Sequence, residues 1–261
     1  MYLDSVYLQF LYLMLYSVIG WVCETIYCSI GQRRFVNRGF LNGPLCPIYG
    51  VGALLVLNLF GPFSSNLPLL FLASMAVTSV IEYITSVLLE KLFHLTLWNY
   101  SGRLFNLHGR ICLRNSLLFG LMSVILVHII HPRFDRWLSK IPENALVWIA
   151  AALFLLLLAD ILYTVRSMLL LNGKIEQIHQ LFEELKEKTA QSLQALQQPE
   201  RGSALQARIE QINRSVGDLL TRHRHSHGRI LKAFPNMKSL KHQEALDQIR
   251  REIKKRKNKI K

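Results

Sequence analysis

The sequence predicts an all-α membrane protein, a polytopic transmembrane helical bundle of about five spans that continues into a C-terminal cytoplasmic helical hairpin or coiled coil. Hydrophobic residues make up 51% of the 261 residues and charged residues only 18%, a balance that suits a membrane protein better than a soluble one. The apolar residues also gather in segments close to the ~20 residues that cross a ~30 Å hydrocarbon core. These segments are residues 6–30, 45–60, 67–89, 113–130 and 145–171.

The first two apolar segments need separate arguments. The chain begins without a basic n-region, and the apolar run that follows is too long for the h-region of a signal peptide. We therefore expect the first span to remain in the protein. The segment 45–60 opens with prolines and is interrupted by Asn58, which leaves open whether it crosses the membrane fully.

Basic residues predict the orientation of the bundle. The first and third loops carry arginines and lysines and the second carries none, so the positive-inside rule places the first and third loops in the cytoplasm. The fourth loop is also basic and argues the other way, but residues 172–261 hold 20 of the 31 Lys and Arg residues. We expect a cell-membrane protein with its N-terminus outside, a transmembrane domain at 1–171 and a basic cytoplasmic helical region at 172–261.

The apolar spacing changes after the last span to an alternation of four and three, which defines a heptad seam. A break at Pro199 precedes a second run of the same spacing. An antiparallel hairpin within one chain and a dimeric coiled coil, which would make the protein a homo-oligomer, are both open. The first seam consists of Leu171, Ile175, Ile178, Phe182 and Leu185, and the second of Leu205, Ile209, Ile212, Val216 and Leu219.

The C-terminal region also raises the question of ligands. Residues 254–261 form a dense basic cluster, for which we expect anionic lipid of the bilayer as the partner rather than nucleic acid, with a solvated tail as the alternative. His223, His225 and His227 alternate with arginines, which disfavours a bound metal. The four cysteines form no CxxC pair, and we expect no disulfide, metal or cofactor.

Four carboxylates lie inside apolar segments, namely Glu24, Glu82, Glu90 and Asp160. A charged carboxylate at the bilayer centre costs about 3 kcal/mol, so each of these side chains should face the protein interior, a wet cavity or an interface. Glu90 is near the end of its segment, where a surface charge is the alternative. Asp160 is six residues from Arg166 and does not share its helix face, so it is free to pair across the bundle.

Two loops of unusual composition flank these acids. Residues 37–50 combine amide, guanidinium, glycine and proline chemistry, which favours a specific non-helical structure. If this loop re-enters the membrane it must be buried in protein or line a cavity; a rigid interfacial loop is the alternative. Residues 98–114 interleave aromatic, amide and arginine side chains, and Trp98 and Tyr100 are explained by an interfacial aromatic belt.

Because both loops are expected on the cytoplasmic side, they can meet the intramembrane acids and form a pocket. Arg110 could close on Glu82 or Glu90, or hold an anionic group. Mixed carboxylate and guanidinium groups suit a zwitterionic or small polar solute. The predicted solute-binding residues are Glu24, Arg38, Asn42, Tyr49, Glu82, Asn106 and Arg110.

With these residues in view, the chain resembles the bacterial membrane family described as putative ABC-transporter type IV. The resemblance rests on residues 20–25, 37–50, 82–93 and 98–110 and covers roughly 15–120. The aromatic motif of the family reads Trp-Asp-Tyr-Ser, whereas Asn99 replaces the acid here. The resemblance implies a transporter permease. No GxxxxGK[ST] phosphate loop is present, so a permease would need a separate ATPase subunit.

The leading functional hypothesis is therefore a transporter permease component for a small polar solute. A membrane-embedded enzyme that acts on a lipid or lipid-linked substrate is an alternative, although neither a nucleophile and base pair nor a metal-ligand cluster can be recognised. A membrane scaffold or regulator that works through its cytoplasmic helices is a third hypothesis.

Overall fold

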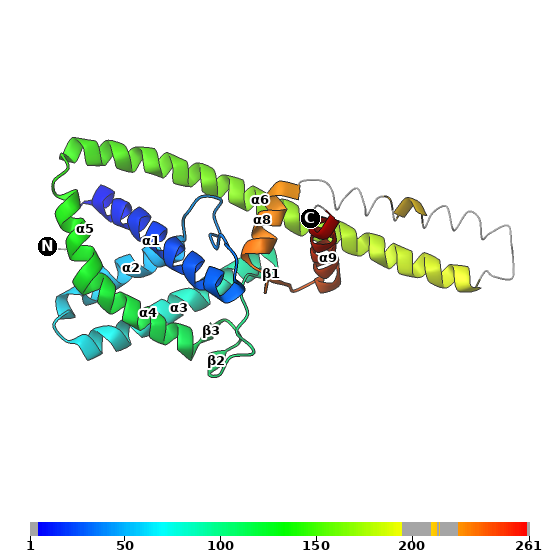
Figure 1. Cartoon of the computed structure of the whole chain (residues 1–261), viewed down its shortest axis with the longest axis horizontal. Helices are drawn as coiled ribbons and strands as arrows, with labels where there is room; N and C mark the ends of the chain where they lie inside the picture. Colours follow the sequence, from blue (N-terminus) through cyan, green and yellow to red (C-terminus); the bar gives the residue numbers. More distant parts are fainter. Residues whose placement is uncertain (1–4, 195–209, 213, 215–223, 260–261) are drawn as a thin grey trace.

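The computed structural model describes residues 5–194, 210–212, 214 and 224–259, and it confirms an all-α bundle (Figure 1). The helices are α1 (Val6–Gln32), α2 (Pro47–Phe60), the short 3₁₀ helix η1 (Gly61–Phe63), α3 (Leu67–Phe93), α4 (Leu113–Ile125), the π-helical η2 (Leu126–Ile130), α5 (His131–Leu138), α6 (Glu143–Gln194), α8 (Arg224–Ala233) and α9 (Gln243–Lys259). The strands form two antiparallel pairs, β1 (Leu95–Thr96) with β4 (Lys238–Ser239) and β2 (Asn106–Leu107) with β3 (Ile111–Cys112).

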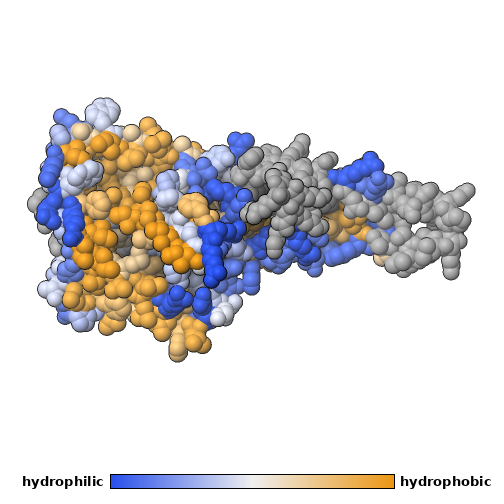
Figure 2. Space-filling model, viewed as in Figure 1, coloured by the Kyte–Doolittle hydropathy of each residue, from blue (hydrophilic) through white to orange (hydrophobic). Residues whose placement is uncertain are grey.

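Four helices within the described residues are long and apolar enough to cross a membrane. They cover Val6–Gln32, Leu67–Phe93, Leu113–Leu138 and Glu143–Lys188, and they correspond to four of the five predicted spans. Hydrophobic side chains cover the flank of the bundle between two bands of hydrophilic residues (Figure 2). This distribution is what a bilayer requires of the surface that faces it.

The second predicted span is shorter than expected. Helix α2 has 14 residues, or about 21 Å, which falls short of the ~30 Å hydrocarbon core. The reason is that α2 begins inside the bundle: the Cys46 amide donates a 3.0 Å hydrogen bond to the Ser17 carbonyl. Ser17 lies about 22 Å before the end of α1, so the loop that precedes α2 re-enters the bundle deeply.

Small residues allow α1 and α2 to approach closely. A Cβ atom on Gly20 would lie 2.3 Å from Tyr49 Cβ. A Cβ atom on Gly50 would lie 2.4 Å from both the Leu13 carbonyl and Ser17 Oγ. Larger side chains at either position would push the helices apart, because such distances are far inside van der Waals contact. The glycines therefore set the position of Tyr49.

Helix α6 continues from the last span without a break, as the sequence predicts, and its 52 residues extend about 78 Å. Its first heptad seam is covered within the same chain. Leu171, Ile175 and Ile178 are fully buried in a core that also contains Leu231 of α8 and Leu246 of α9. Helices of the same chain therefore cover this part of the seam.

Strand pairing attaches the C-terminal segment to the bundle. In the β1–β4 pair Leu95 lies opposite Ser239, and the Leu240 amide donates a 3.0 Å hydrogen bond to the His94 carbonyl. The predicted break at Pro199, most of the second seam, the side chains of the histidine tract 223–227 and those of the basic tail 254–261 lie outside the described residues.

Candidate functional site

Glu24 is the centre of the first half of the site. Its position on α1 puts it beside the re-entrant loop and the first turn of α2. One carboxylate oxygen accepts a hydrogen bond from the Tyr49 hydroxyl, and the other accepts one from Arg38 Nε at 3.2 Å. Glu24 thus connects α1, the re-entrant loop and α2.

Arg38 is held by contacts to two parts of the chain. Besides its ion pair with Glu24, its Nη1 donates a 2.5 Å hydrogen bond to the Ala233 carbonyl at the end of α8. The guanidinium also lies over the ring of Phe234, 4.6 Å from the ring centroid, which is within the range of a cation–π contact. The positive charge of Arg38 is therefore offset by Glu24, and its guanidinium is held by the C-terminal segment.

Glu82 is the centre of the second half. Glu82 is only 5% exposed, and its Oε1 accepts a 3.2 Å hydrogen bond from the Tyr100 hydroxyl. The same hydroxyl accepts a 2.7 Å hydrogen bond from Asn115 Nδ2 in α4. The other oxygen, Glu82 Oε2, is buried and has no hydrogen-bond partner among the described residues.

Tyr100 shows that the two halves share one environment. Burial raises the pKa of the Tyr100 hydroxyl far above its usual value, the negative charges of Glu82 and Glu24 raise this pKa further, and the positive charge of Arg38 lowers it. A charge acts more strongly on its neighbours in a low-dielectric interior than in water, so these groups influence one another. We refer to Glu24, Arg38, Tyr49, Glu82 and Tyr100 as the inner polar cluster.

Arg110 forms a separate pair with Glu90. Its Nε and Nη2 donate to the two Glu90 oxygens at 3.2 and 2.5 Å, and its Nη1 donates to the Tyr83 hydroxyl at 3.0 Å. The hydrogen bonds and charge of Glu90 raise the pKa of Arg110. Glu82, Glu90 and an anionic group were the predicted partners of Arg110, and in the structure Arg110 pairs with Glu90. Glu90 is therefore a paired group and not an isolated surface charge.

The re-entrant loop is held by charged side chains from two distant helices. Asp160 of α6 accepts hydrogen bonds from the Asn42 amide at 2.9 Å and the Gly43 amide at 2.8 Å. Arg229 of α8 donates to the Gly39 and Phe40 carbonyls at 2.9 and 3.0 Å, and burial lowers the pKa of Arg229. These bonds satisfy backbone groups that hydrocarbon would leave unpaired.

Four of the seven predicted site residues lie together, and the other three have separate roles. Glu24, Arg38, Tyr49 and Glu82 belong to the inner polar cluster. Asn42 contributes its backbone amide, whereas its side chain is exposed. Asn106 stabilises the β2–β3 hairpin, because its side chain bonds the Arg103 carbonyl at 2.8 Å and the Gly109 amide at 3.0 Å. Arg110 pairs with Glu90 beside the cluster.

Two residues of the site were missed by the sequence reasoning. The aromatic-belt interpretation of Tyr100 was incomplete, because the hydroxyl of this residue bonds a buried acid. Asn115 was not considered, although an amide three residues into an apolar segment is itself a signal of an internal partner. Trp98 also has a specific contact, a 3.0 Å hydrogen bond from its Nε1 to the Arg110 carbonyl.

A second polar cluster lies toward the opposite end of the bundle. Tyr12 donates a 2.5 Å hydrogen bond to Asp135 Oδ1, and the Tyr16 hydroxyl lies 2.7 Å from His131 Nδ1. Both tyrosines are buried. These groups bond to one another, so we interpret them as a clamp between α1 and α5.

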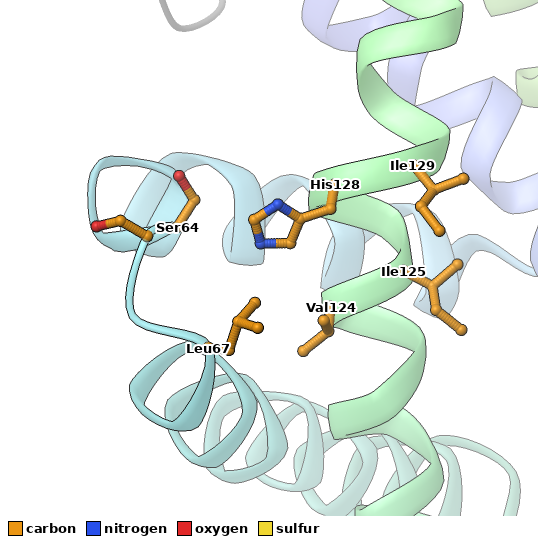
Figure 3. A pocket seen from close by; sticks show the side chains of 7 residues that line it. Ser64, Leu67, Val124, Ile125, His128 and Ile129 are labelled. Atoms are coloured by element: carbon orange, nitrogen blue, oxygen red, sulfur yellow. The ribbon is translucent and has the colours of Figure 1, made fainter.

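A cavity away from the inner polar cluster is mainly apolar. It has a volume of about 410 Å³ and is lined mainly by aliphatic side chains of α3, α4 and η2, including Leu67, Val124 and Ile125, together with His128 and Ser64 (Figure 3). It contains none of the acids of the inner polar cluster. The described part of the chain contains no group of three His, Cys, Asp or Glu side chains that could hold a metal ion.

The arrangement in the inner polar cluster is chemically asymmetric. The charge of Arg38 is offset by Glu24, whereas Glu82 offers an acceptor oxygen that no described residue uses. A cluster of this kind favours a ligand that donates hydrogen bonds over an anion.

No curated protein and no solved structure matches the chain. The model of one protein family does match, over residues 11–165, which are more than half of the chain and include the four spans up to the middle of α6. The chain therefore belongs to the family of putative ABC-transporter type IV proteins.

Proposed function

We propose that the chain is a transporter permease component that carries a small polar solute through the inner polar cluster. The family and the apolar helices support a membrane protein with a transport role. The observation that carries the choice of site is Glu82 Oε2, which has no hydrogen-bond partner among the described residues, because a buried acceptor without a partner costs about 1–3 kcal/mol. A solute that donates a hydrogen bond to this atom recovers that cost.

The neighbours of Glu82 favour a particular kind of solute. Arg38 and Arg110 are each ion-paired with a glutamate, so the positive charge that would attract an anion is already offset. We therefore propose a neutral or cationic donor, such as a small amine, in place of the zwitterion. The Tyr49 and Tyr100 hydroxyls would orient it through their bonds to the acids.

Two further parts of the proposal concern the partner subunit and the orientation in the membrane. An ATP-driven permease needs an ATPase, and we propose that a separate subunit supplies it on the cytoplasmic side. We also propose that this side carries the loops 33–46 and 94–112 and the C-terminus, with the N-terminus outside. Basic residues in these loops support this orientation.

The test measures solute uptake in membrane vesicles from cells that express the full chain. Labelled methylammonium, acetamide and acetate are small probes of similar size and different charge. Glu82→Gln is expected to abolish chain-dependent uptake of methylammonium. Glu143→Gln makes the same chemical change on an exposed side chain that bonds Tyr7 and is expected to leave uptake unchanged. Full uptake by Glu82→Gln would overturn the proposed site.

One observation favours a second candidate, a regulatory role of the C-terminal helices. Arg229 and the Ala233 carbonyl of α8 bond the re-entrant loop and Arg38, respectively. Displacement of α8 would release the loop that positions the cluster. Arg229→Gln is expected to change the uptake rate without removing any cluster residue; an unchanged rate would argue against regulation through this contact.

A further inference from the structure

A second cavity lies where the loop between α3 and β2 meets the C-terminal segment. Its volume is about 270 Å³, enough for a small ionic group and a short extension of it. It is distinct from the inner polar cluster, since the two share no residue. Its polar lining residues are Asn99, Ser101, Asn236, Lys238, Gln243 and Arg250.

The lining of this junction cavity carries two positive charges and no acid. Lys238 is exposed on β4 and forms no ion pair within the described part of the chain. Gln243 is already occupied, since it accepts from the Ser239 amide and donates to Asp247. The available donors are therefore the Lys238 ammonium, the amides of two asparagines and the Ser101 hydroxyl.

Arg250 is incompletely satisfied. Its Nη2 donates a 2.5 Å hydrogen bond to the Met237 carbonyl and its Nη1 lies 3.3 Å from Asp247 Oδ1. Its Nε is buried and has no partner in the regions that the structure describes. A buried cationic donor without an acceptor is costly, and an oxygen of a ligand in the adjoining cavity would provide one.

The surroundings of the cavity reinforce its charge. Residues 229–251 contain six Lys and Arg residues and only two acids, Glu244 and Asp247. One of those acids is paired with Arg250. The segment that contributes most of the lining therefore has a net positive charge, which favours anions over amines.

We propose that the junction cavity binds an oxyanion, specifically a phosphate group. Lys238 and Arg250 supply the charge, and Asn99, Ser101 and Asn236 supply neutral donors around it. Phosphate presents several strong acceptor oxygens, which match a lining made of donors. The group can belong to free inorganic phosphate or to the headgroup of an anionic lipid, because the loop that carries Asn99 leaves the bundle directly from α3.

The site also has a structural link to the inner polar cluster. Tyr100, whose hydroxyl bonds Glu82, lies in the chain between Asn99 and Ser101. An oxyanion that holds these two residues against the C-terminal segment therefore fixes the backbone of Tyr100.

The test titrates inorganic phosphate into the purified full chain in detergent and follows binding by calorimetry. Lys238→Gln removes an exposed charge and is expected to weaken binding about tenfold, as loss of one charged hydrogen bond does. Asn99→Asp retains the Oδ1 atom that accepts from the Ser101 amide but adds a negative charge, and is expected to weaken binding by at least as much. Lys241→Gln removes a neighbouring charge outside the lining and should weaken binding much less than Lys238→Gln does.

A second arm of the experiment separates the two sources of phosphate. The chain is placed in nanodiscs of phosphatidylcholine with or without phosphatidylglycerol. If phosphatidylglycerol abolishes the binding of inorganic phosphate, a lipid headgroup occupies the site; if binding persists, free phosphate does. Binding that is equal in the wild type, Lys238→Gln and Asn99→Asp, or absent from all of them in both arms, would overturn the proposal.

Discussion

The contact between Asp160 and the re-entrant loop gives the sharpest prediction about the fold. Asp160 accepts hydrogen bonds from the Asn42 and Gly43 amides. Asp160→Ala leaves both donors unpaired at a cost of about 1–3 kcal/mol each, or about 2–6 kcal/mol together. Asp160→Asn keeps one acceptor and should cost about 1–3 kcal/mol. Because 1.4 kcal/mol is a factor of ten, the open form of the loop should become about 5–150 times more populated in Asp160→Asn.

Thiol labelling measures this opening directly. Cys46 ends the loop and is buried, and burial raises the pKa of its thiol to about 12, so it is unreactive in the closed state. In a chain that retains only this cysteine, the labelling rate with N-ethylmaleimide should increase in the order wild type, Asp160→Asn, Asp160→Ala. Glu176→Gln, on the same helix, is the control. Equal rates in all four proteins would refute the re-entrant loop.

Two further predictions concern the cluster and the C-terminal segment. Tyr100→Phe removes the only hydroxyl that bonds Glu82 within the described residues and should lower methylammonium uptake at least tenfold while the purified protein elutes normally on gel filtration. Burial lowers the pKa of His242, and the charges of the stacked His179 and of Lys241 lower it further. The charge of Glu176 acts in the opposite direction. The folded state therefore favours neutral His242, so stability is present above the unfolded pKa of ~6.5 and is lost as the pH falls through the folded value. The melting temperature should decrease on acidification below about pH 6.5, and the decrease should be smaller in His242→Gln.

The helices themselves could be predicted from the sequence because long apolar runs have few alternative structures in a membrane. The length of α2 could not. Its start depends on the bond between Cys46 and Ser17, and a tertiary contact of this kind leaves no periodic pattern. The short α2 nevertheless agrees with the prolines that open this segment, which left its crossing of the membrane open.

The candidate site could be predicted in part for a similar reason. A carboxylate in an apolar segment must have a partner, so Glu24, Glu82 and Asp160 were recognisable as interior groups. Which partner each acid takes depends on the path of the loops. Asn106 and Arg110 are both polar residues of one loop. In the structure Asn106 stabilises a hairpin, whereas Arg110 pairs with Glu90.

The second polar cluster could not be anticipated, because His131 and Asp135 near the end of a span resemble ordinary interfacial residues. Its role follows only from the packing of Tyr12 and Tyr16 against them. The covering of the heptad seam by α8 and α9 is a similar case. The spacing of leucines and isoleucines predicts a buried stripe but does not say whether the same chain or a second one covers it.

The unpaired oxygen of Glu82 is the centre of the functional account, and infrared difference spectroscopy tests it most directly. Methylammonium is added to the full chain in lipid, and the spectrum without the probe is subtracted. We expect a change in a carboxylate or carboxyl band in the wild type and in Glu143→Gln, and no such change in Glu82→Gln. Identical difference spectra for the wild type and Glu82→Gln would contradict it.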